Sequence, residues 1–264
     1  MLVACAADAL PETGDLSGQL LEIPAEQHRP ACIQRSSQVA LFGDSYINWI
    51  SHTFPEDLNR VARARFRDYA VGGYSMATGG IGSIPSELDT ALAEDPDILA
   101  AVVDGGGNDI LVSDVLQFPQ SWDCKNSEDS PNIPDCQKIV RLAVEVAEKT
   151  LQRMADVGIR DVVYFFYPHV PEGTLIGGLH PNEILNYALP KAKATCDGTL
   201  EMTGGALACH FVDMVPVFEG HPEFFAPTDI HPNPLGSAAM AKAVWAKMKS
   251  ACMGQRASSG CCEP

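Results

Sequence analysis

Apolar residues in this chain gather in short continuous runs that are separated by longer segments of mixed polarity. Runs of this kind, without alternation of polar and apolar positions, are typical of strands buried on both faces of a parallel sheet. They predict strands at Gln38–Phe42, Phe66–Val71, Ile98–Val103, Asp161–Tyr167 and Leu207–Val212.

Between these runs, apolar residues recur at steps of three and four, which is the period of an amphipathic helix. The clearest helix is predicted at Asp135–Val157, with Asp135 as its cap and Gly158 as its end. Further helices are predicted at Trp49–Ala64, Ser86–Ala93, Glu183–Cys196 and Leu235–Lys249.

Strands that alternate with helices favour right-handed crossovers and a parallel sheet covered by helices on both sides. We find no internal repeat and no sign of a second core. The sequence predicts one domain at 38–250, preceded by a polar, proline-bearing arm at 1–37 and followed by a tail at 251–264.

Three strand ends carry groups that are suited to chemistry. Ser45 follows the first strand in a Gly-Asp-Ser triplet, Gly73 follows the second, and Asn108 follows the third after a run of glycines. Because functional groups of parallel sheets gather beyond the carboxyl ends of the strands, we expect these three residues to lie together.

A serine hydroxyl needs a base before it can act as a nucleophile. Of the seven histidines, His231 is the strongest candidate, because it lies in a loop between prolines, just before the last predicted helix. A lone histidine is more often a surface or core residue than a catalytic one. The sequence nevertheless favours Ser45 as nucleophile and His231 as base.

An attacking serine also creates an oxyanion that requires preplaced donors. The backbone N–H groups of Ser45 and Gly73 and the side-chain amide of Asn108 are the candidates. Each also has a plain structural interpretation, Gly73 as a turn residue and Asn108 as part of a turn and helix cap.

Taken together, these blocks resemble a known family. Gly43-Asp44-Ser45, Gly73, Gly107-Asn108-Asp109 and His231-Pro232 follow the order and rough spacing of the four blocks of SGNH hydrolases, also called the GDSL family. The resemblance covers about residues 38–250. The resemblance implies a three-layer α/β/α, flavodoxin-like fold with about five parallel strands. It also implies ester hydrolysis without a metal or organic cofactor. Ser45, Gly73, Asn108 and His231 would have the roles given above.

One position departs from the family pattern. The family usually places an aspartate three residues before the histidine, and here that position is Thr228, with Asp229 one residue later. A kinked loop could let Asp229 orient His231, a main-chain carbonyl could do so in a Ser–His dyad, or another carboxylate could come from elsewhere. We take Asp229 as the third catalytic residue, and the alternatives stay open.

Charge and cysteine content limit the partners and the compartment. A net charge of −16 disfavours nucleic acids and anionic membranes. None of the nine cysteines forms a C-x-x-C pair, so disulfides in an exported protein explain them better than zinc. We expect bonds between Cys124 and Cys136 and between Cys196 and Cys209, each closing a short loop.

The start of the chain adds a membrane hypothesis. Leu2-Val3-Ala4-Cys5 has the form of a bacterial lipobox, and removal of Cys5 would leave an even number of cysteines. We expect an exported protein that is secreted, periplasmic or anchored at the bacterial surface. Lipidation at Cys5 would supply the anchor, and it is the only membrane contact that we expect.

The sequence thus predicts a monomeric serine esterase for small acyl esters, such as short-chain esters, acetylated sugars or lysolipids. Two alternatives remain: an acyltransferase that uses the same chemistry, and a non-catalytic surface lipoprotein that binds glycan or lipid.

Overall fold

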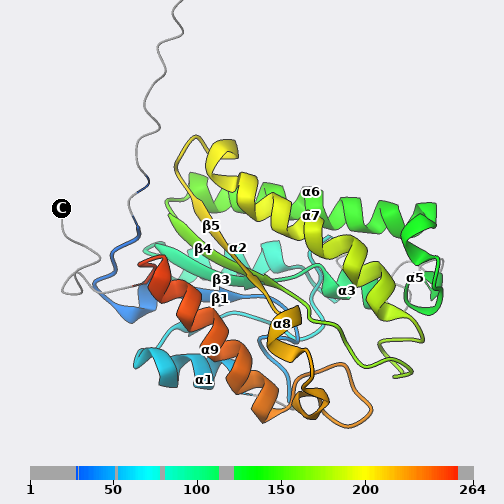
Figure 1. Cartoon of the computed structure of the whole chain (residues 1–264). Helices are drawn as coiled ribbons and strands as arrows, with labels where there is room; N and C mark the ends of the chain where they lie inside the picture. Colours follow the sequence, from blue (N-terminus) through cyan, green and yellow to red (C-terminus); the bar gives the residue numbers. More distant parts are fainter. Residues whose placement is uncertain (1–27, 29, 51–52, 78–80, 113–121, 255–264) are drawn as a thin grey trace, which may run out of the picture.

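Five parallel strands form the centre of the part of the chain that the structure describes. The structure is a computed structural model that describes residues 28, 30–50, 53–77, 81–112 and 122–254. The strand order is β2-β1-β3-β4-β5 (Figure 1). Their bounds are β1 (Val39–Phe42), β2 (Arg67–Asp68), β3 (Ala100–Asp104), β4 (Asp161–Phe166) and β5 (Ala208–Asp213).

The sheet is paired in a continuous register. Val39 to Phe42 of β1 align with Ala100 to Val103 of β3, and Ala100 to Asp104 of β3 align with Asp161 to Phe165 of β4. All residues of these three strands are buried, as the uninterrupted apolar runs predicted. Parallel pairing puts the carboxyl ends of the strands at one edge of the sheet, where the candidate site lies.

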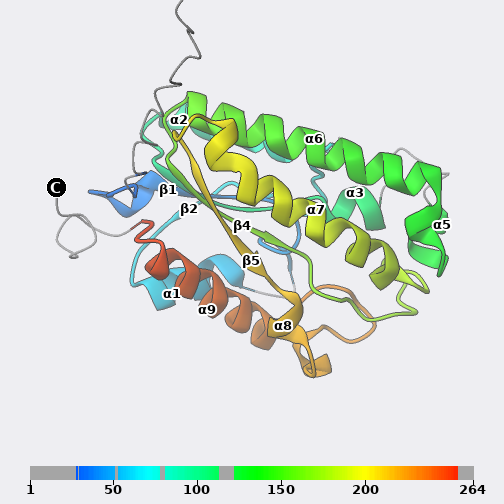
Figure 2. The ribbon, with the colours of Figure 1, turned by 45° about the horizontal axis from the view of Figure 1, so that its top comes forward.

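Helices cover both faces of the sheet (Figures 1 and 2). α1 (Phe54–Ala62) and α9 (Pro234–Ser250) pack side by side on one face. α6 (Pro134–Asp156) and α7 (Pro181–Met202) cover the other, and α2 (Ile84–Glu94) is joined to α6 by the ion pair between Asp89 and Arg153. The predicted three-layer α/β/α fold is therefore confirmed.

Several element bounds differ from the sequence-based prediction. The helix predicted from Trp49 begins only at Phe54, because the residues after Ser45 form a turn of their own. Asp135 does not cap α6: Ile133 holds the cap position and Pro134 and Asp135 follow in the first turn. The helix expected to end at Cys196 continues to Met202, through Pro190.

The segment before α6 contains short helical elements in its described part. These are α5 (Trp122–Asn126) and the 3₁₀ turn η3 (Ser130–Asn132). Cys124 of α5 is bonded to Cys136 of α6, as the sequence predicted. This bond ties the middle of α5 to the start of α6.

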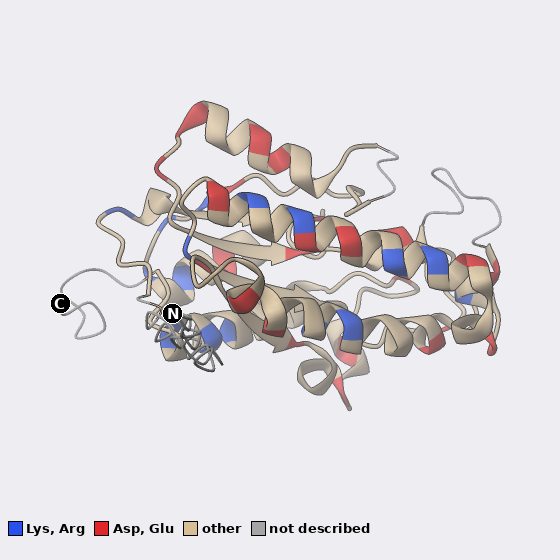
Figure 3. Cartoon of the chain, turned by 90° about the horizontal axis from the view of Figure 1, so that it is seen from above, with Lys and Arg blue, Asp and Glu red and all other residues tan. Residues whose placement is uncertain are grey.

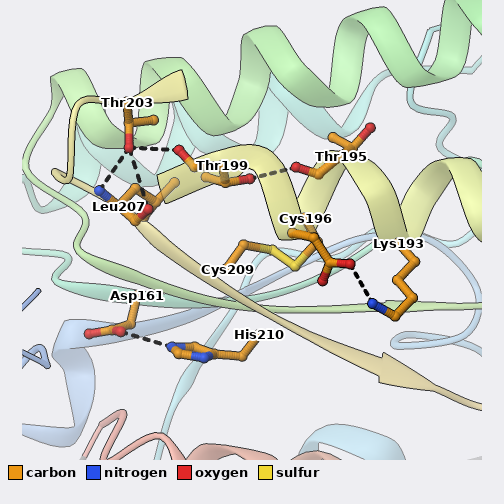
Figure 4. The surroundings of a disulfide bond; sticks show 10 residues. Asp161, Lys193, Thr195, Cys196, Thr199, Thr203, Leu207, Cys209 and His210 are labelled. Carbon is orange, nitrogen blue, oxygen red and sulfur yellow. Dashed lines mark hydrogen bonds and ion pairs between the residues drawn. A yellow bond between two sulfur atoms is a disulfide. The ribbon is translucent and has the colours of Figure 1, made fainter. Parts of the chain in front are cut away.

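The second expected disulfide is also confirmed. Cys196 of α7 is bonded to Cys209 of β5, so the long helix is tied to the edge strand it covers (Figure 4). Cys32 and Cys252 are disulfide-bonded as well. Cys5 lies outside the described residues, as do the rest of 1–27 and the tail from 255, so the lipobox hypothesis and the outer bounds of the predicted arm and tail stay predictions.

Charged residues of both signs are spread along the helices. Figure 3 shows Lys and Arg interspersed with Asp and Glu along the helical layer, above a sheet of mostly uncharged residues. No helix among the described residues is both long enough and apolar enough to cross a membrane.

Candidate active site

Ser45 lies in a tight turn directly after β1. The carbonyl of Asp44 accepts hydrogen bonds from the N–H groups of Ile47 and Asn48 at 3.1 and 3.0 Å, which makes one helical turn around the serine. Position 43 must be glycine, since a Cβ there would lie 1.6 Å from Oδ1 of Asp104. The turn delivers the Ser45 hydroxyl to the carboxyl edge of the sheet, with only 2% of the residue exposed.

His231 meets Ser45 at this edge from the far end of the sequence. Its Nε2 lies 2.9 Å from Ser45 Oγ, and its Nδ1 lies 2.7 Å from Oδ1 of Asp229. A carboxylate only accepts hydrogen bonds, so Nδ1 carries the proton and Nε2 is left to accept from the serine hydroxyl. Asp229, His231 and Ser45 thus form a hydrogen-bonded chain in the order that nucleophile activation requires.

A kink at Thr228 makes this arrangement with Asp229 geometrically feasible. Thr228 has a φ of +59°, in the left-handed region that a β-branched residue rarely adopts. The Thr228 side chain is exposed and donates to the carbonyl of Pro227, whereas Asp229 Oδ1 accepts from both the N–H of Ile230 and the ring of His231. Of the three ways in which His231 could be oriented, the structure has the geometry of the first, a kinked loop that places Asp229 beside the imidazole.

The environment of His231 suits a base. Burial lowers the pKa of His231 below its ordinary value, and the neighbouring Asp229 carboxylate acts in the opposite direction. The imidazole is therefore neutral at pH 7 and can accept a proton, while Asp229 is placed to stabilise the cation that results.

Gly73 and Asn108 come to the same edge through a direct contact between their segments. The Asn108 amide donates to the carbonyl of Tyr74 at 2.8 Å, and the Tyr167 hydroxyl lies 3.3 Å from Asn108 Oδ1. Gly73 has a φ of +89°, and its N–H makes no hydrogen bond with another described residue. One N–H of the Asn108 amide and the N–H of Gly73 are thus available as donors.

Asp109 fixes the segment that follows Gly73. Its two carboxylate oxygens accept from the N–H groups of Met76 and Ala77, both at 2.7 Å. Asn108 and Asp109, which begin α3 (Gly107–Leu111), therefore hold the second block against the third. The structure brings together all four regions that the sequence singled out.

A group of buried carboxyl groups lies beneath the serine turn. Asp44 and Asp104 are fully buried neighbours, and the N–H of Asp44 donates to Asp104 Oδ1 at 2.7 Å. Glu87 of α2 accepts from the N–H groups of Gly43 and Val71. Burial raises the pKa of Asp44 to about 6 and that of Glu87 to about 9, and it raises the pKa of Asp104 well above its ordinary range.

Protons held by these carboxyl groups limit the negative charge under the site. Two ionised carboxylates in contact without water would repel each other, so the Asp44–Asp104 pair retains a proton near neutral pH. Tyr167 donates to both oxygens of Asp44 at 2.9 Å. An oxyanion forming above Ser45 would therefore not face a fully ionised cluster.

Three aromatic residues pack around Ser45 and His231. Tyr46 donates to the carbonyl of Ile230 at 2.8 Å and stacks on Tyr167, and Trp49 stacks on His231. Tyr167 follows β4 at the same sheet edge as Ser45, so its position was a usable signal. Tyr46 follows Ser45 directly, so the sequence already marks it as a neighbour of the catalytic blocks. Nothing in the local sequence marks Trp49, because its partner His231 lies far along the chain.

The described residues contain no group of three or more His, Cys, Asp or Glu side chains that could hold a metal ion. The chemistry that this geometry allows is nucleophilic attack by Ser45, assisted by His231 and by donors at Gly73 and Asn108.

Solved structures with this fold include esterases. A carbohydrate acetylesterase family member from Sinorhizobium meliloti is 14% identical, with a TM-score of 0.55, covering 81% of this chain and 97% of its own. An acetylxylan esterase from Geobacillus stearothermophilus is 13% identical, with a TM-score of 0.50, covering 80% of this chain and 93% of its own. No family model and no curated protein matches the chain. At these identities the likeness concerns the fold.

Proposed function

We propose that this chain, which has the fold of the SGNH hydrolases, is a serine esterase that hydrolyses small acyl esters through an acyl-Ser45 intermediate. The observation that carries the proposal is the hydrogen-bonded chain from Asp229 through His231 to Ser45. A protein that only binds glycan or lipid needs no such chain, and this argues against the non-catalytic alternative.

In the first half of the reaction, Ser45 Oγ attacks the ester carbonyl carbon while His231 Nε2 takes the hydroxyl proton. The carbonyl oxygen becomes an oxyanion, which the N–H groups of Ser45, Gly73 and Asn108 stabilise. The bond to the alcohol oxygen then breaks, and the proton passes from Nε2 to that oxygen. The alcohol leaves and the acyl group remains on Ser45.

In the second half, a water molecule replaces the alcohol. His231 Nε2 takes a proton from the water as it attacks the acyl carbon, and a second oxyanion forms in the same position. Collapse of this intermediate breaks the bond to Ser45 Oγ, which regains the proton from His231, and releases the carboxylic acid. Asp229 holds the Nδ1 proton throughout and stabilises the imidazolium in both halves.

The acyl group is proposed to be small. The two solved structures named above are a carbohydrate acetylesterase family member and an acetylxylan esterase, which supports acetylated sugars as the first substrates to test. The disulfides at Cys124–Cys136 and Cys196–Cys209 support a location in an oxidising compartment, and hence export.

The direct test is hydrolysis of p-nitrophenyl acetate by the wild-type protein and by Ser45→Ala. Activity that is lost in Ser45→Ala supports the proposal; equal rates in both proteins refute it. A panel of p-nitrophenyl esters of increasing acyl length, together with acetylated xylan, then defines the substrate. Addition of a sugar or lipid alcohol separates the esterase from a transferase, because a transferase yields a new ester in place of free acid.

A further inference from the structure

The indole of Trp49 covers one face of the His231 imidazole. The two ring centroids are 4.3 Å apart and the planes differ by only 16°, so the rings are stacked. Trp49 lies four positions after Ser45 and directly follows the turn that carries the serine. The segment that carries the nucleophile therefore also supports the base.

The neighbouring chain fixes the indole in this position. Gly72 lies against its edge: a Cβ at Gly72 would approach Trp49 Cε3 to 2.8 Å. The preceding residue, Asn48, donates from its side chain to the carbonyl of Ala70 at 2.8 Å. The position of Trp49 is thus defined by the segment before Gly73 as well as by the turn around Ser45.

A stacked indole acts differently on the two protonation states of a histidine. The negative face of the indole attracts a cation, and this attraction grows where water is excluded. Asp229 approaches His231 in the plane of the ring at 2.7 Å, the Ser45 hydroxyl lies at Nε2, and the Tyr46 ring is 6.5 Å away at a tilt of 43°. Trp49 thus adds stabilisation from the ring face, a direction that Asp229 does not cover.

We infer that Trp49 is a positioning residue, which holds the plane of the His231 ring and stabilises its protonated form as it takes the proton of Ser45. The inference rests on the proposed function for its catalytic consequence, but the effect of Trp49 on His231 is a property of the folded protein. It can be measured with no substrate present.

Trp49→Leu and Trp49→Phe form the decisive pair. Leucine keeps an apolar cover over His231 but has no π face, whereas phenylalanine keeps both. Loss of the π face should lower the pKa of His231 by about half a unit to one unit and kcat by about 3- to 10-fold, with KM unchanged. Trp49→Phe should recover most of both quantities.

The pKa of His231 is read from the shift of its Cε1–H proton in NMR titrations, assigned with His231→Gln. Trp122→Leu on α5 is the matched control, since Trp122 is 56% exposed, and it should leave that pKa unchanged.

The outcomes separate this inference from the proposed function. A wild-type pKa in Trp49→Leu, or equal effects of leucine and phenylalanine, overturns the role of Trp49 whatever the activity. If the pKa shifts as expected while the wild-type protein shows no Ser45-dependent hydrolysis, the role of Trp49 stands and the esterase proposal falls.

Discussion

Replacement of Asp229 tests how His231 is held. In the structure a single oxygen, Oδ1, accepts from the ring of His231 and from the N–H of Ile230, both at 2.7 Å. Asp229→Ala removes the partner of Nδ1, so the ring is free to turn and to adopt the wrong tautomer. By comparison with serine hydrolase triads, kcat should fall by about 10³- to 10⁴-fold.

Asp229→Asn separates charge from geometry. The asparagine Oδ1 can accept the same hydrogen bonds, so the tautomer is preserved and only the charge is lost. A carboxylate about 4 Å from an imidazolium contributes about 4 kcal/mol at an effective dielectric of about 20. The Asp229 side chain is 28% exposed, so water screens part of this attraction. The expected loss in kcat is therefore about 30- to 1000-fold, smaller than for alanine.

An aspartate at position 228, the usual family position, should not restore the activity that is lost in Asp229→Ala. The Thr228 side chain is exposed and faces the Pro227 carbonyl, so an aspartate there points away from His231. Thr228→Asp alone should remain active, and Thr228→Asp combined with Asp229→Ala should be as slow as Asp229→Ala. Steady-state hydrolysis of p-nitrophenyl acetate measures all four proteins. A kcat within about threefold of wild type in Asp229→Ala would refute the triad and favour a dyad.

Three further predictions follow from the contacts around the site. Tyr46→Phe leaves the buried carbonyl of Ile230 without its hydrogen-bond donor, so the free energy of unfolding measured in urea should fall by about 1 to 3 kcal/mol. The kcat should also fall, with KM unchanged. Unaltered stability and kcat would show that this hydrogen bond does not hold the loop. The acid limb of the kcat/KM profile against pH should have its midpoint below pH 6.5, because burial lowers the pKa of His231 and only the neutral ring accepts a proton. A flat profile down to about pH 4 would exclude His231 as the base. The pKa of Glu87 is about 4.5 in the unfolded chain but about 9 in the fold, so between these values the folded state holds one more proton than the unfolded state. Tm should therefore fall as pH rises through this window, and Glu87→Gln should flatten that slope. An unchanged slope in Glu87→Gln would show that Glu87 is ionised throughout.

The sequence predicted the fold and most of the site because both depend on local signals. Apolar runs mark buried parallel strands wherever they occur, and Ser45, Gly73 and Asn108 follow such runs directly. The bounds of α1 and the cap of α6 were wrong because local propensity competes there with turns and prolines: the turn around Ser45 delays α1, and Pro134 occupies the first helical position of α6.

The orientation of His231 could not be predicted, because it depends on a conformation that the sequence does not favour. A threonine with a positive φ costs about 1 to 2 kcal/mol and is held only by its surroundings. The bridge between Phe225 and Pro232 and the bond from Tyr46 to Ile230 close the loop around it. The first contact lies within the loop itself, and the second joins residues 184 positions apart, so no spacing rule reveals the kink.

The most direct test of the account is to locate the acyl group on the protein. The wild-type protein is mixed with excess p-nitrophenyl acetate, quenched in acid within milliseconds and digested, and the acetylated peptide is sequenced by mass spectrometry. We predict acetylation at Ser45, in step with a burst of p-nitrophenol, and no such burst in His231→Ala. Hydrolysis without acylation of Ser45, or the same burst in Ser45→Ala, would contradict the central claim.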